Sequence, residues 1–549
     1  MKRTLVALVC VVVVLLSLRT LLNNTFFNLH DNTHVGRLAE MHRGLLDGQF
    51  PVRWSQNLGY GYGMPLFSFY GPTPYYLAEV FHLTGFSYLV SIKLLLGAMT
   101  VFAFVGMYLL CSRWFGRVGG LIAAVVFVVF PYRAVDVFVR GAFNEIFAVS
   151  AVPWILWATV KIRESKNKQW IGWYSIFLLI FLTTHNLMTL MFLPIIYAFG
   201  LLGALSATNK KRYLLRFHVS FVLGILAACF FILPITFEKG YTQVDQLTGG
   251  YSNYKYHFLY IRQLFTGKWG YGGSILGPED GLSFSLGILQ IVLAAVGGVV
   301  WFIKTRKPTA KLLPVFLTIV TAIALFLTLV KSTPIWDSIP AFAYFQFPWR
   351  FLSVPTLTIP ILAGATVFLI KNAKLRMLFG LVVIVAVVAV NLQYFHPEKF
   401  LDNPSALYSD DPVQIQTRLS ETIPDYLPMS MKVIQAPGQA PVEIDGLQPS
   451  EITTLVARST ERLYSFTLQK PSTMTIRIAW YPNWTVYDGP NKIPFTVDPQ
   501  SGFIKIALQP GQHLIAARLE DTPLRAGANL LSVVGLLLIA GVFLYDRHR

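Results

Sequence analysis

Charged residues are scarce in this sequence. Asp, Glu, Lys and Arg make up 13% of its 549 residues, against about 25% in an average soluble domain. Hydrophobic residues account for 54% and aromatic residues for 14%. A soluble chain of this length would form three or four domains of about 150 residues each, and the shortage of charge excludes that organisation. The composition predicts a polytopic membrane protein with many aromatic side chains at membrane interfaces.

Cysteine is scarce as well. The chain has three cysteines, each in or at the edge of an apolar run: Cys10, Cys111 and Cys229. None of them lies in a long polar segment, so we expect neither a disulfide framework nor a zinc site. Free cysteines in such positions usually pack as small hydrophobic side chains.

Long apolar runs, in contrast, are plentiful. A helix needs roughly 20 mostly apolar residues to cross a bilayer, and twelve segments meet this requirement. They lie at about 4–22, 87–111, 118–133, 145–162, 171–187, 188–206, 218–236, 284–303, 312–330, 351–370, 377–394 and 526–545. No small-residue cleavage site follows the first run, so we expect an uncleaved first span rather than a signal peptide.

The few charges are unevenly distributed. Lys and Arg outnumber Asp and Glu by 45 to 27, a net charge of +18, which would ordinarily indicate a nucleic-acid partner. With the N-terminus inside, however, every second connection is basic, as the positive-inside rule requires. Beside only two acids, Glu164 and Asp546, the inner segments carry Lys2, Arg3, Arg113, Arg117, Lys161, Arg163, Lys166, Lys168, Lys210, Lys211, Arg212, Arg216, Lys304, Arg306, Lys307, Lys311, Lys371, Lys374, Arg376, Arg547 and Arg549. We therefore expect a multi-pass plasma-membrane protein with both termini cytoplasmic and no nucleic-acid partner.

Motifs for nucleotide chemistry are missing from these short inner loops, which contain neither a P-loop nor a dinucleotide fingerprint. The long, varied segments are predicted on the outside, at 23–86, 134–144, 237–283, 331–350 and 395–525. The predicted domains are a multi-span membrane domain over 1–394, an extracytoplasmic mainly-β domain over 395–525, and a final transmembrane helix with a cytoplasmic tail over 526–549.

The outer segment 395–525 begins with loop and a helical turn or two near 413–422. Residues 474–480 then alternate apolar and polar side chains, which is the period of a half-buried strand. Residues 484–497 predict a hairpin across Asp488-Gly489. Eight or nine short strands favour a β-sandwich. Such a domain could bind glycan or cap the membrane portion, and we favour a cap or acceptor platform.

The first outer loop, 23–86, concentrates residues that can carry chemistry. A helix capped by Asn32 or Thr33 is predicted to end near Leu46. Four residues are expected on one side of this helix: His30, Asp31, His34 and Arg37. A carboxylate flanked by imidazoles just outside a span suits a general base or a ligand for a hard cation. The alternative is that Asp31 is an ordinary capping acid.

Three further outer loops carry candidate residues. Arg140 is close in sequence to Asp136 and Glu145, and ionisable residues at membrane depth tend either to pair or to mark a site. His185 joins two spans, where it either ends a helix through backbone hydrogen bonds or takes part in catalysis. Arg350 follows an aromatic cluster, and its guanidinium suits a phosphate, with snorkelling to a phospholipid head group as the alternative.

In this order, the outer loops resemble those of polyprenol-phosphate-dependent membrane glycosyltransferases of the GT-C class. In particular, the chain is similar to the bacterial membrane family labelled "6-pyruvoyl-tetrahydropterin synthase-related", with YfhO-like membrane proteins as relatives. The resemblance covers almost the whole chain. It rests on His30-Asp31 after the first span, RGAFNE at 140–145, THN at 184–186, QFPWRF at 346–351 and WYPNWTVYDG at 480–489.

The resemblance implies an outward-facing catalytic cavity in a multi-span helical fold. There, a sugar would move with inversion from a polyprenyl-phosphate donor to a glycan, lipid or protein acceptor, in cell-envelope glycan or glycolipid assembly. It implies Asp31 as the catalytic base and Glu145, or alternatively Asp136, as a second acid. The implied substrate-binding residues are His30, His34, Arg140, His185 and Arg350, the last of which would hold the donor phosphate.

The paired-acid pattern common in the first loop of this class is absent here, because Asp31 stands between His30 and Asn32. Metal ligands are therefore unassigned, with a divalent cation as an optional cofactor. The main alternative function is a transporter or flippase of a lipid-linked sugar, although we find no convincing internal repeat of the kind common in transporters. The other alternative is a non-catalytic membrane partner in polysaccharide assembly.

Overall fold

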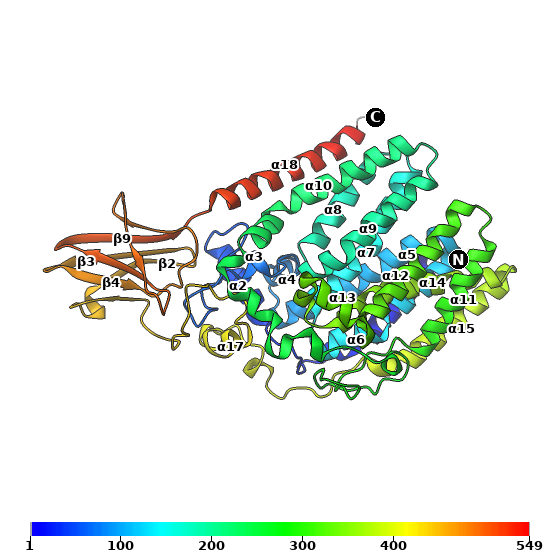
Figure 1. Ribbon diagram of the computed structural model, residues 1–549, viewed down its shortest axis with the longest axis horizontal. Helices are drawn as coiled ribbons and strands as arrows, with labels where there is room; N and C mark the ends of the chain where they lie inside the picture. The colour runs from blue at the N-terminus through cyan, green and yellow to red at the C-terminus, as the bar shows by residue number, and fades with distance from the viewer. Residues whose placement is uncertain (1–2, 548–549) are drawn as a thin grey trace.

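Helices form most of the molecule, whose computed structural model describes residues 3–547 (Figure 1). Several helices begin at a capping side chain: Ser87, Asn209 and Asn372 accept hydrogen bonds from the first-turn amides of α5, α10 and α15. The helices are α1 (Arg3–Ser17), α2 (His34–Leu46), α3 (Leu66–Phe69), α4 (Thr73–Leu83), α5 (Tyr88–Val128), α6 (Pro131–Val135), α7 (Phe143–Glu164), α8 (Gln169–Leu182), α9 (Asn186–Leu205), α10 (Lys210–Phe237), α11 (Ile288–Lys304), α12 (Pro308–Thr328), α13 (Thr333–Ser338), α14 (Ser353–Gly364), α15 (Ala373–Asn391), α16 (Pro412–Gln414), α17 (Ser420–Thr422) and α18 (Pro523–Arg547).

Within residues 3–547, eight helical segments are long and apolar enough to cross a membrane, and three shorter apolar helices accompany them. The longest segment, Tyr88–Arg140, covers two of the predicted spans. It bends at Gly116, whose φ of 70° interrupts the helical backbone. The prediction of a mostly helical membrane protein is therefore confirmed, whereas the number of twelve spans stays a prediction. The three cysteines are buried, as expected for packing thiols.

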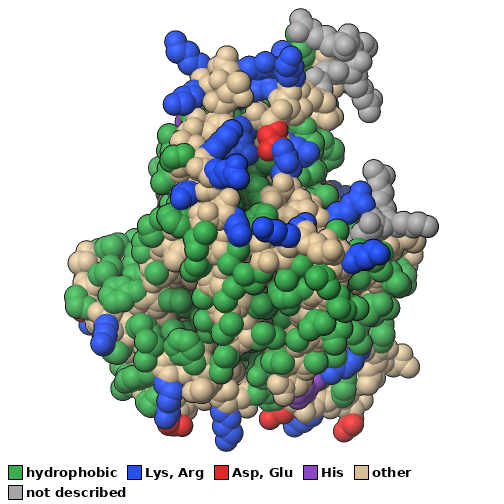
Figure 2. Space-filling model, turned by 90° about the vertical axis from the view of Figure 1, so that its right-hand side faces the viewer, with side chains coloured by type: hydrophobic (Ala, Val, Ile, Leu, Met, Phe, Trp, Pro, Cys, Tyr) green, Lys and Arg blue, Asp and Glu red, His purple; other side chains and the backbone are tan. Residues whose placement is uncertain are grey.

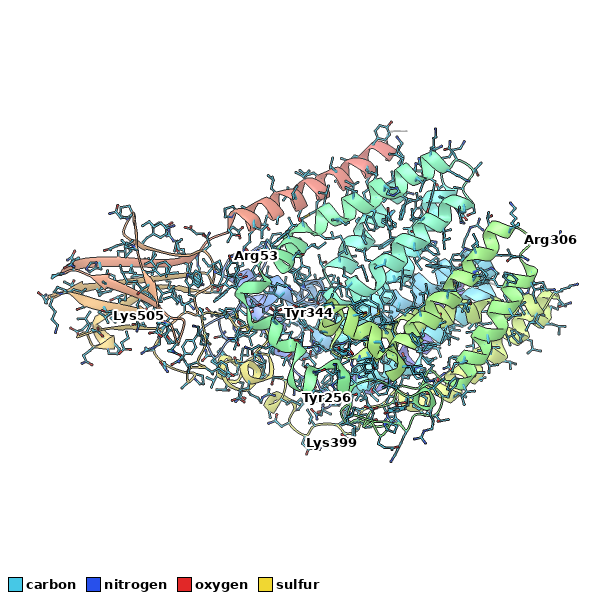
Figure 3. All side chains as sticks on the ribbon, viewed as in Figure 1. Arg53, Tyr256, Arg306, Tyr344, Lys399 and Lys505 are labelled. Carbon is cyan, nitrogen blue, oxygen red and sulfur yellow. The ribbon has the colours of Figure 1, made fainter. Side chains whose placement is uncertain are left out.

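The end of the helical bundle farthest from the strands carries basic side chains. Figure 2 views this end and shows Lys and Arg gathered over one half of it, with few acids. Arg306, labelled in Figure 3, lies at this end, whereas Lys505 lies among the strands at the opposite end. The side of the membrane that this end faces stays a prediction, and two of the predicted inner basic residues, Lys2 and Arg549, lie outside the described residues.

The strands form two antiparallel sheets between α17 and α18. One sheet has the order β1-β4-β8-β7 and the other the order β2-β3-β9-β5-β6. The strands are β1 (Val442–Ile444), β2 (Thr453–Arg458), β3 (Glu461–Leu468), β4 (Ser472–Ile476), β5 (Trp484–Asp488), β6 (Asn491–Ile493), β7 (Thr496–Val497), β8 (Ile504–Leu508) and β9 (Gly511–Leu519). The predicted hairpin is confirmed as β5–β6, although its loop is Gly489-Pro490, one residue later than expected.

Two outer segments far apart in sequence pack together: the first outer loop and the stretch 395–441 that follows α15. Phe27 and Phe400 form a β-bridge, and the Tyr408 hydroxyl donates to the Phe27 carbonyl at 2.7 Å. Closer to the strands, the Gln416 amide donates to Asn57 Oδ1 at 3.0 Å. These contacts make the two segments one layer between the helices and the sheets, and both cavities described below are lined by it.

The first-loop helix begins after Thr33 and ends at Leu46 as predicted, but the expected placement of His30 and Asp31 on it was wrong. α2 begins at His34, so His34 and Arg37 lie on it whereas His30 and Asp31 precede it. The reason is that the backbone amides of His30 and Asp31 donate to carbonyls of the second outer loop instead of entering the helix. Thr33 occupies the N-cap position, but its hydroxyl bonds to the Asp31 carboxylate and leaves the helix amides uncapped.

Candidate functional site

A cavity of about 530 Å³ lies where the outer loops meet. Six of the seven predicted site residues line it: His30, Asp31, Arg140, Glu145, His185 and Arg350. The seventh, His34, is buried behind the wall, 3.8 Å from Asp31. Tyr344, labelled in Figure 3, also lines the cavity and lies between the strands and the basic end of the bundle. The structure therefore brings these residues together from four separate segments of the chain.

Asn144 holds three of these segments in place. Its side-chain amide donates to the carbonyl of Gly71 in the first outer loop and to that of Thr184 in the third, both at 2.9 Å. Gly71 is required there, because a β-carbon at this position would lie 1.9 Å from the Thr184 carbonyl oxygen. The RGAFNE motif thus carries an assembly residue between its two charged residues, a role that no local pattern indicates.

Asp31 is the most exposed acid of the predicted set, at 29% of its side chain. Arg37 donates to its Oδ2 at 2.8 Å, and the Thr33 hydroxyl donates to its Oδ1 at 2.6 Å. Burial alone would raise the pKa of Asp31, but the Arg37 charge, the neighbouring His34 and these hydrogen bonds hold its pKa well below the usual range. Asp31 is therefore an ionised carboxylate at any physiological pH.

The two histidines near Asp31 have separate structural partners. His34 Nε2 donates to the Gly141 carbonyl at 2.6 Å, so its Nδ1 is the acceptor for the Tyr75 hydroxyl at 2.9 Å. Burial lowers the pKa of His34, which keeps the ring neutral and fixes this tautomer. His30 Nε2 contacts the Tyr271 carbonyl at 2.9 Å, so His30 ties the first loop to the loop before α11.

Glu145 is the centre of a buried ionic network, with 1% of its side chain exposed. Arg140 donates to its Oε2 at 2.9 Å, and the hydroxyls of Ser353 and Tyr132 donate to its Oε1 at 2.7 and 3.2 Å. Arg140 also forms a hydrogen-bonded ion pair with Asp136, so both structural pairings that the sequence left open are present. Three donors thus contact this buried carboxylate at hydrogen-bond distance, which leaves Glu145 little capacity for a substrate.

Arg350 turns toward the cavity rather than toward the outer surface. It lies on the 3₁₀ turn η10 (Pro348–Leu352) that leads into α14, and its Nη1 donates to the Phe345 carbonyl at 2.7 Å and to Gln346 Oε1 at 2.6 Å. Its Nε is buried without a hydrogen-bond partner and lies 4.0 Å from Glu145 Oε2. A buried, unpaired N–H costs about 1–3 kcal/mol, so this donor is poised for a ligand.

His185 is both a helix cap and a wall of the cavity. Its Nδ1 accepts from the Met188 amide at 3.3 Å at the start of α9, which leaves Nε2 as the nitrogen that carries the proton. Burial lowers the pKa of His185 to about 4, against the opposing charge of Glu145. The ring is therefore a neutral donor near pH 7. The two sequence-based alternatives, capping and participation in the site, are compatible in this geometry.

Asp425 is a cavity residue that the sequence reasoning missed. It lies between α17 and the strands and lines the same wall as Tyr426. Within the described part of the chain, its carboxyl has no hydrogen bond or ion pair at contact distance. Burial raises the pKa of Asp425 to about 6, although Arg37 opposes the rise, and Asp31 adds to it. No sequence pattern marks this position, because it belongs to an irregular stretch.

Metal-ligating side chains are not clustered in residues 3–547: no group of three or more His, Cys, Asp or Glu could hold an ion. The carboxylates of Asp31 and Glu145 instead face Arg37 and Arg140. Guanidinium groups thus occupy the positions beside the acids, and the charge near the site comes from arginine side chains.

These features define a class: a multi-helix membrane protein whose connecting loops enclose a polar cavity lined by arginine–carboxylate pairs. More narrowly, the chain belongs to the family of membrane proteins described as "6-pyruvoyl-tetrahydropterin synthase related domain", whose model matches residues 67–397. No curated protein matches the sequence.

Several solved structures have a similar arrangement. Arabinofuranosyltransferase AftD from Mycobacteria is 14% identical with a TM-score of 0.47, over 73% of this chain and 28% of AftD. The Archaeoglobus fulgidus oligosaccharyltransferase is 14% identical with a TM-score of 0.43, over 74% and 56%. ArnT from Cupriavidus metallidurans, bound to undecaprenyl phosphate, is 12% identical with a TM-score of 0.37, over 76% and 77%. The chain thus spans less than a third of AftD, and at these values the similarity assigns no activity.

Proposed function

We propose that this protein is an integral-membrane glycosyltransferase of the GT-C kind. It transfers a sugar from a polyprenyl-phosphate donor to an acceptor hydroxyl on the outer face of the membrane, in cell-envelope glycan or glycolipid assembly. The observation that carries the proposal is the shared cavity, which combines a partly exposed carboxylate, Asp31, with an inward-facing guanidinium, Arg350. The resemblance of the outer loops to that class supports it.

Arg350 binds the donor phosphate in this proposal. Its Nε is buried without a hydrogen-bond partner, and a guanidinium binds phosphate through donors in a fixed fork. Arg140 adds a second positive charge and is held against the Trp349 ring, 4.5 Å from its centre. Stabilising the negative charge that develops on the leaving phosphate is the largest contribution that such a site makes to the rate.

Two carboxylates, Asp31 and Asp425, act on the acceptor hydroxyl. The acceptor oxygen attacks the anomeric carbon of the sugar while the bond from that carbon to the phosphate oxygen breaks, and the polyprenyl phosphate leaves with the electron pair. Asp31 orients the acceptor hydroxyl as a permanently ionised hydrogen-bond acceptor. Asp425 takes the proton, because a base with a pKa near 6 matches proton transfer at neutral pH better than a strongly acidic carboxylate.

The remaining predicted site residues act through these groups. Glu145 positions Arg140 and Arg350 through the network described above. His34 fixes the second outer loop beside Asp31, and His185 offers a neutral N–H to the cavity. His30 holds the loop before α11 against the site.

Transfer of a radiolabelled sugar from a polyprenyl-phosphate donor by the purified protein tests the proposal. We expect Asp31→Asn to lose transfer by about 100-fold or more, while the matched control Asp402→Asn, at an exposed acid outside the cavity, keeps it. Undiminished transfer by Asp31→Asn would overturn the assignment. If sugar crosses proteoliposomes without new glycosidic bonds, the protein is a transporter instead. If neither occurs while the protein still binds glycan, it is a non-catalytic partner.

The membrane orientation, the twelve spans and a β-sandwich arrangement of the two sheets belong to the same proposal. Lys505 in β8 is expected outside the cell and Arg306 inside. A cysteine introduced at each position, in cells treated with an impermeant maleimide, checks this: labelling at 505 and protection at 306 are expected. The reverse pattern would place the cavity on the cytoplasmic side.

A further inference from the structure

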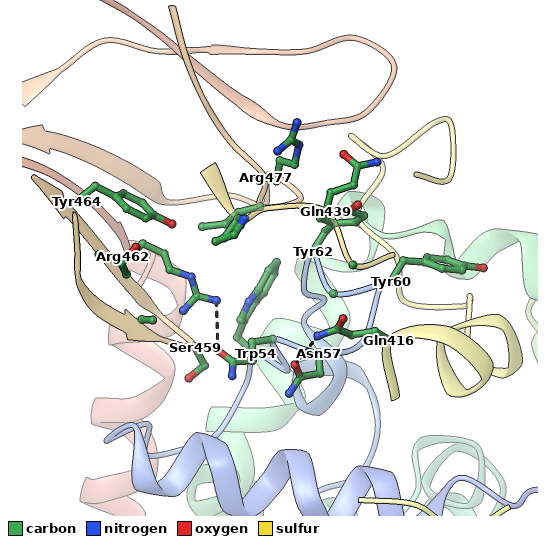
Figure 4. Close-up of a pocket in the computed structure, with 17 residues that line it drawn as sticks. Trp54, Asn57, Tyr60, Tyr62, Gln416, Gln439, Ser459, Arg462, Tyr464 and Arg477 are labelled. Carbon is green, nitrogen blue, oxygen red and sulfur yellow. Dashed lines mark hydrogen bonds between the residues drawn. The ribbon is translucent and has the colours of Figure 1, made fainter. Parts of the chain in front are cut away.

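A second, smaller pocket lies between the first outer loop and the sheets (Figure 4). Its volume is about 270 Å³, near the lower end of the roughly 300–1,000 Å³ that small-molecule sites occupy. One wall comes from the loop residues between Trp54 and Tyr62, and the other from β2, β3 and the residues just after β4. The space suits a single ring-sized unit rather than a long chain lying along a groove.

Side-chain amides and aromatic rings dominate the lining. The amides come from both sides of the pocket: Gln56, Asn57, Gln416 and Gln439. A side-chain amide both donates and accepts hydrogen bonds, which matches the hydroxyl groups of a sugar. Trp54, Tyr60 and Tyr62 add apolar faces to the same space, against which the C–H face of a sugar ring packs.

The residues that line the pocket also carry a net positive charge. Arg462 and Arg477 line it, and no Asp or Glu of the described chain does. Arg477 is paired with Glu443 outside the pocket. Arg462 has neutral partners only, the Arg458 carbonyl and Gln56 Oε1, the latter at 3.2 Å. A carboxylate or phosphate is the natural partner of such a guanidinium.

Tyr464 provides an independent indication of a ligand. Its side chain lines the pocket from β3 and is 0% exposed, yet its hydroxyl is buried without a hydrogen-bond partner. Figure 4 shows this hydroxyl directed from the strand toward the pocket interior. A buried hydroxyl left unpaired is destabilising, so a tyrosine at this position is understandable when a bound molecule completes the hydrogen bond.

We propose that this pocket binds one acidic sugar unit, a monosaccharide of a glycan that carries a carboxylate or a phosphate. Arg462 holds the anionic group, Tyr464 and the amides bind the hydroxyls, and the aromatic rings contact the ring face. The first outer loop and the stretch 395–441 line both this pocket and the larger cavity. Within that stretch, Gln416 lines the pocket, and Asp425, nine residues later, lines the cavity. In the proposed function, on which this assignment rests, the bound sugar unit is part of the acceptor glycan.

Isothermal titration calorimetry on the full-length protein in detergent tests the binding directly. The probes are methyl β-D-glucuronide, glucose 6-phosphate, methyl β-D-glucoside and inorganic phosphate. We expect at least one acidic sugar to bind about tenfold or more tightly than both the neutral glucoside and inorganic phosphate. The two acidic probes separate a carboxylate ligand from a phosphate ligand.

Two substitutions locate the site. Arg462→Gln removes a charged hydrogen bond and should weaken binding about 10–100-fold. Tyr464→Phe should weaken binding about 2–10-fold while leaving the melting temperature unchanged or higher, because it removes an unpaired buried hydroxyl. The matched control is Arg518→Gln, an arginine on the same sheet that is 51% exposed and paired with Glu461, which should leave affinity unchanged.

Each contrary result overturns the inference. It fails if no acidic sugar binds, if the glucoside or inorganic phosphate binds equally well, or if both pocket variants keep wild-type affinity. Failure of the proposed function is a different outcome: binding of the acidic sugar would persist, with the same loss in Arg462→Gln, in a protein that transfers no sugar from a polyprenyl-phosphate donor.

Discussion

Replacing Asp425 with asparagine separates stability from catalysis at one position. Asp425 lines the catalytic cavity, and burial raises its pKa to about 6 from an ordinary 3.8. In the unfolded chain the carboxyl ionises near 3.8, so between pH 3.8 and 6 the folded protein binds more protons than the unfolded one. The carboxyl of Asp425 therefore lowers the stability of the fold as the pH rises through this window, and the loss is complete above about pH 6.

The size of this effect follows from the shift. A difference of about two pKa units corresponds to about 3 kcal/mol at most, and solvent reaching the half-buried carboxyl makes the measured value smaller. Asp425→Asn removes the ionisation and should stabilise the protein at pH 7.5 by about 1–3 kcal/mol. Below about pH 3 the advantage should vanish, because the carboxyl is then protonated in both the folded and the unfolded protein. Melting curves of the detergent-solubilised protein across this pH range measure the difference.

Transfer should respond in the opposite direction. If Asp425 takes the acceptor proton, wild-type kcat/KM falls below about pH 6 as this carboxyl becomes protonated. Asp425→Asn should lose about 100- to 10,000-fold in kcat and lose that acid limb as well. The control Asp402→Asn should keep both the rate and the pH profile.

Two results would refute this reasoning. Wild-type transfer that stays level down to pH 5 would show that no group with a pKa near 6 acts as the base. An Asp425→Asn protein that is stabilised but fully active would show that the carboxyl is merely buried beside Arg37 and Asp31. A buried carboxyl without a catalytic role would give stabilisation in Asp425→Asn but keep the acid limb of the pH profile. Stabilisation together with loss of the acid limb therefore indicates that Asp425 is the base.

Three other substitutions have expected outcomes. Arg350→Lys keeps the positive charge but loses the paired donors of the guanidinium, so the KM for the polyprenyl-phosphate donor should rise about tenfold or more. An unchanged KM would show that Arg350 does not bind the donor. Glu145→Gln removes a counter-ion from a buried guanidinium and should lower the free energy of unfolding by about 3–5 kcal/mol. The KM for the donor should rise in Glu145→Gln and be partly restored in Glu145→Asp. Equal KM values in both variants would leave Glu145 a purely structural role. His185→Ala should lose about 1 kcal/mol of cap stability and His185→Asn much less, measured by thermal melting; equal losses would contradict capping.

The sequence placed the candidate residues in separate loops, and the resemblance implied that these loops share one cavity. Glu145, His185 and Arg350 each stand beside the end of an apolar segment and Asp31 follows the first one, so all four can reach the same end of the helical bundle. Charge at that depth must find partners, so convergence follows from topology and composition together. The exact pairing does not follow: Arg140 bonds to both Asp136 and Glu145, a choice that only packing makes.

What the sequence could not show depends on contacts between distant segments. His30 and Asp31 have the spacing of a helix face, yet their amides donate to the second outer loop, so the helix starts only at His34. Asp425 lies in a stretch without periodicity, and nothing local indicates that it returns to the first outer loop. The pocket around Arg462 and Tyr464 exists only because that loop packs against the sheets.

The charges of the larger cavity fit the proposed binding of a phosphate and a hydroxyl together. Among the described residues that line it, Asp31 is paired with Arg37 and Glu145 with Arg140 at hydrogen-bond distance. Two charged groups have no charged partner at hydrogen-bond distance: Arg350, whose Nε lies 4.0 Å from Glu145 Oε2, and Asp425. The phosphate of the donor pairs with Arg350, and Asp425 accepts the proton of the acceptor hydroxyl. The other charges of the cavity are neutralised in ion pairs, so one bound donor and one bound acceptor satisfy the two remaining groups. A ligand that contacts only Arg350 or only Asp425 leaves the other charged group without a partner in a low-dielectric cavity.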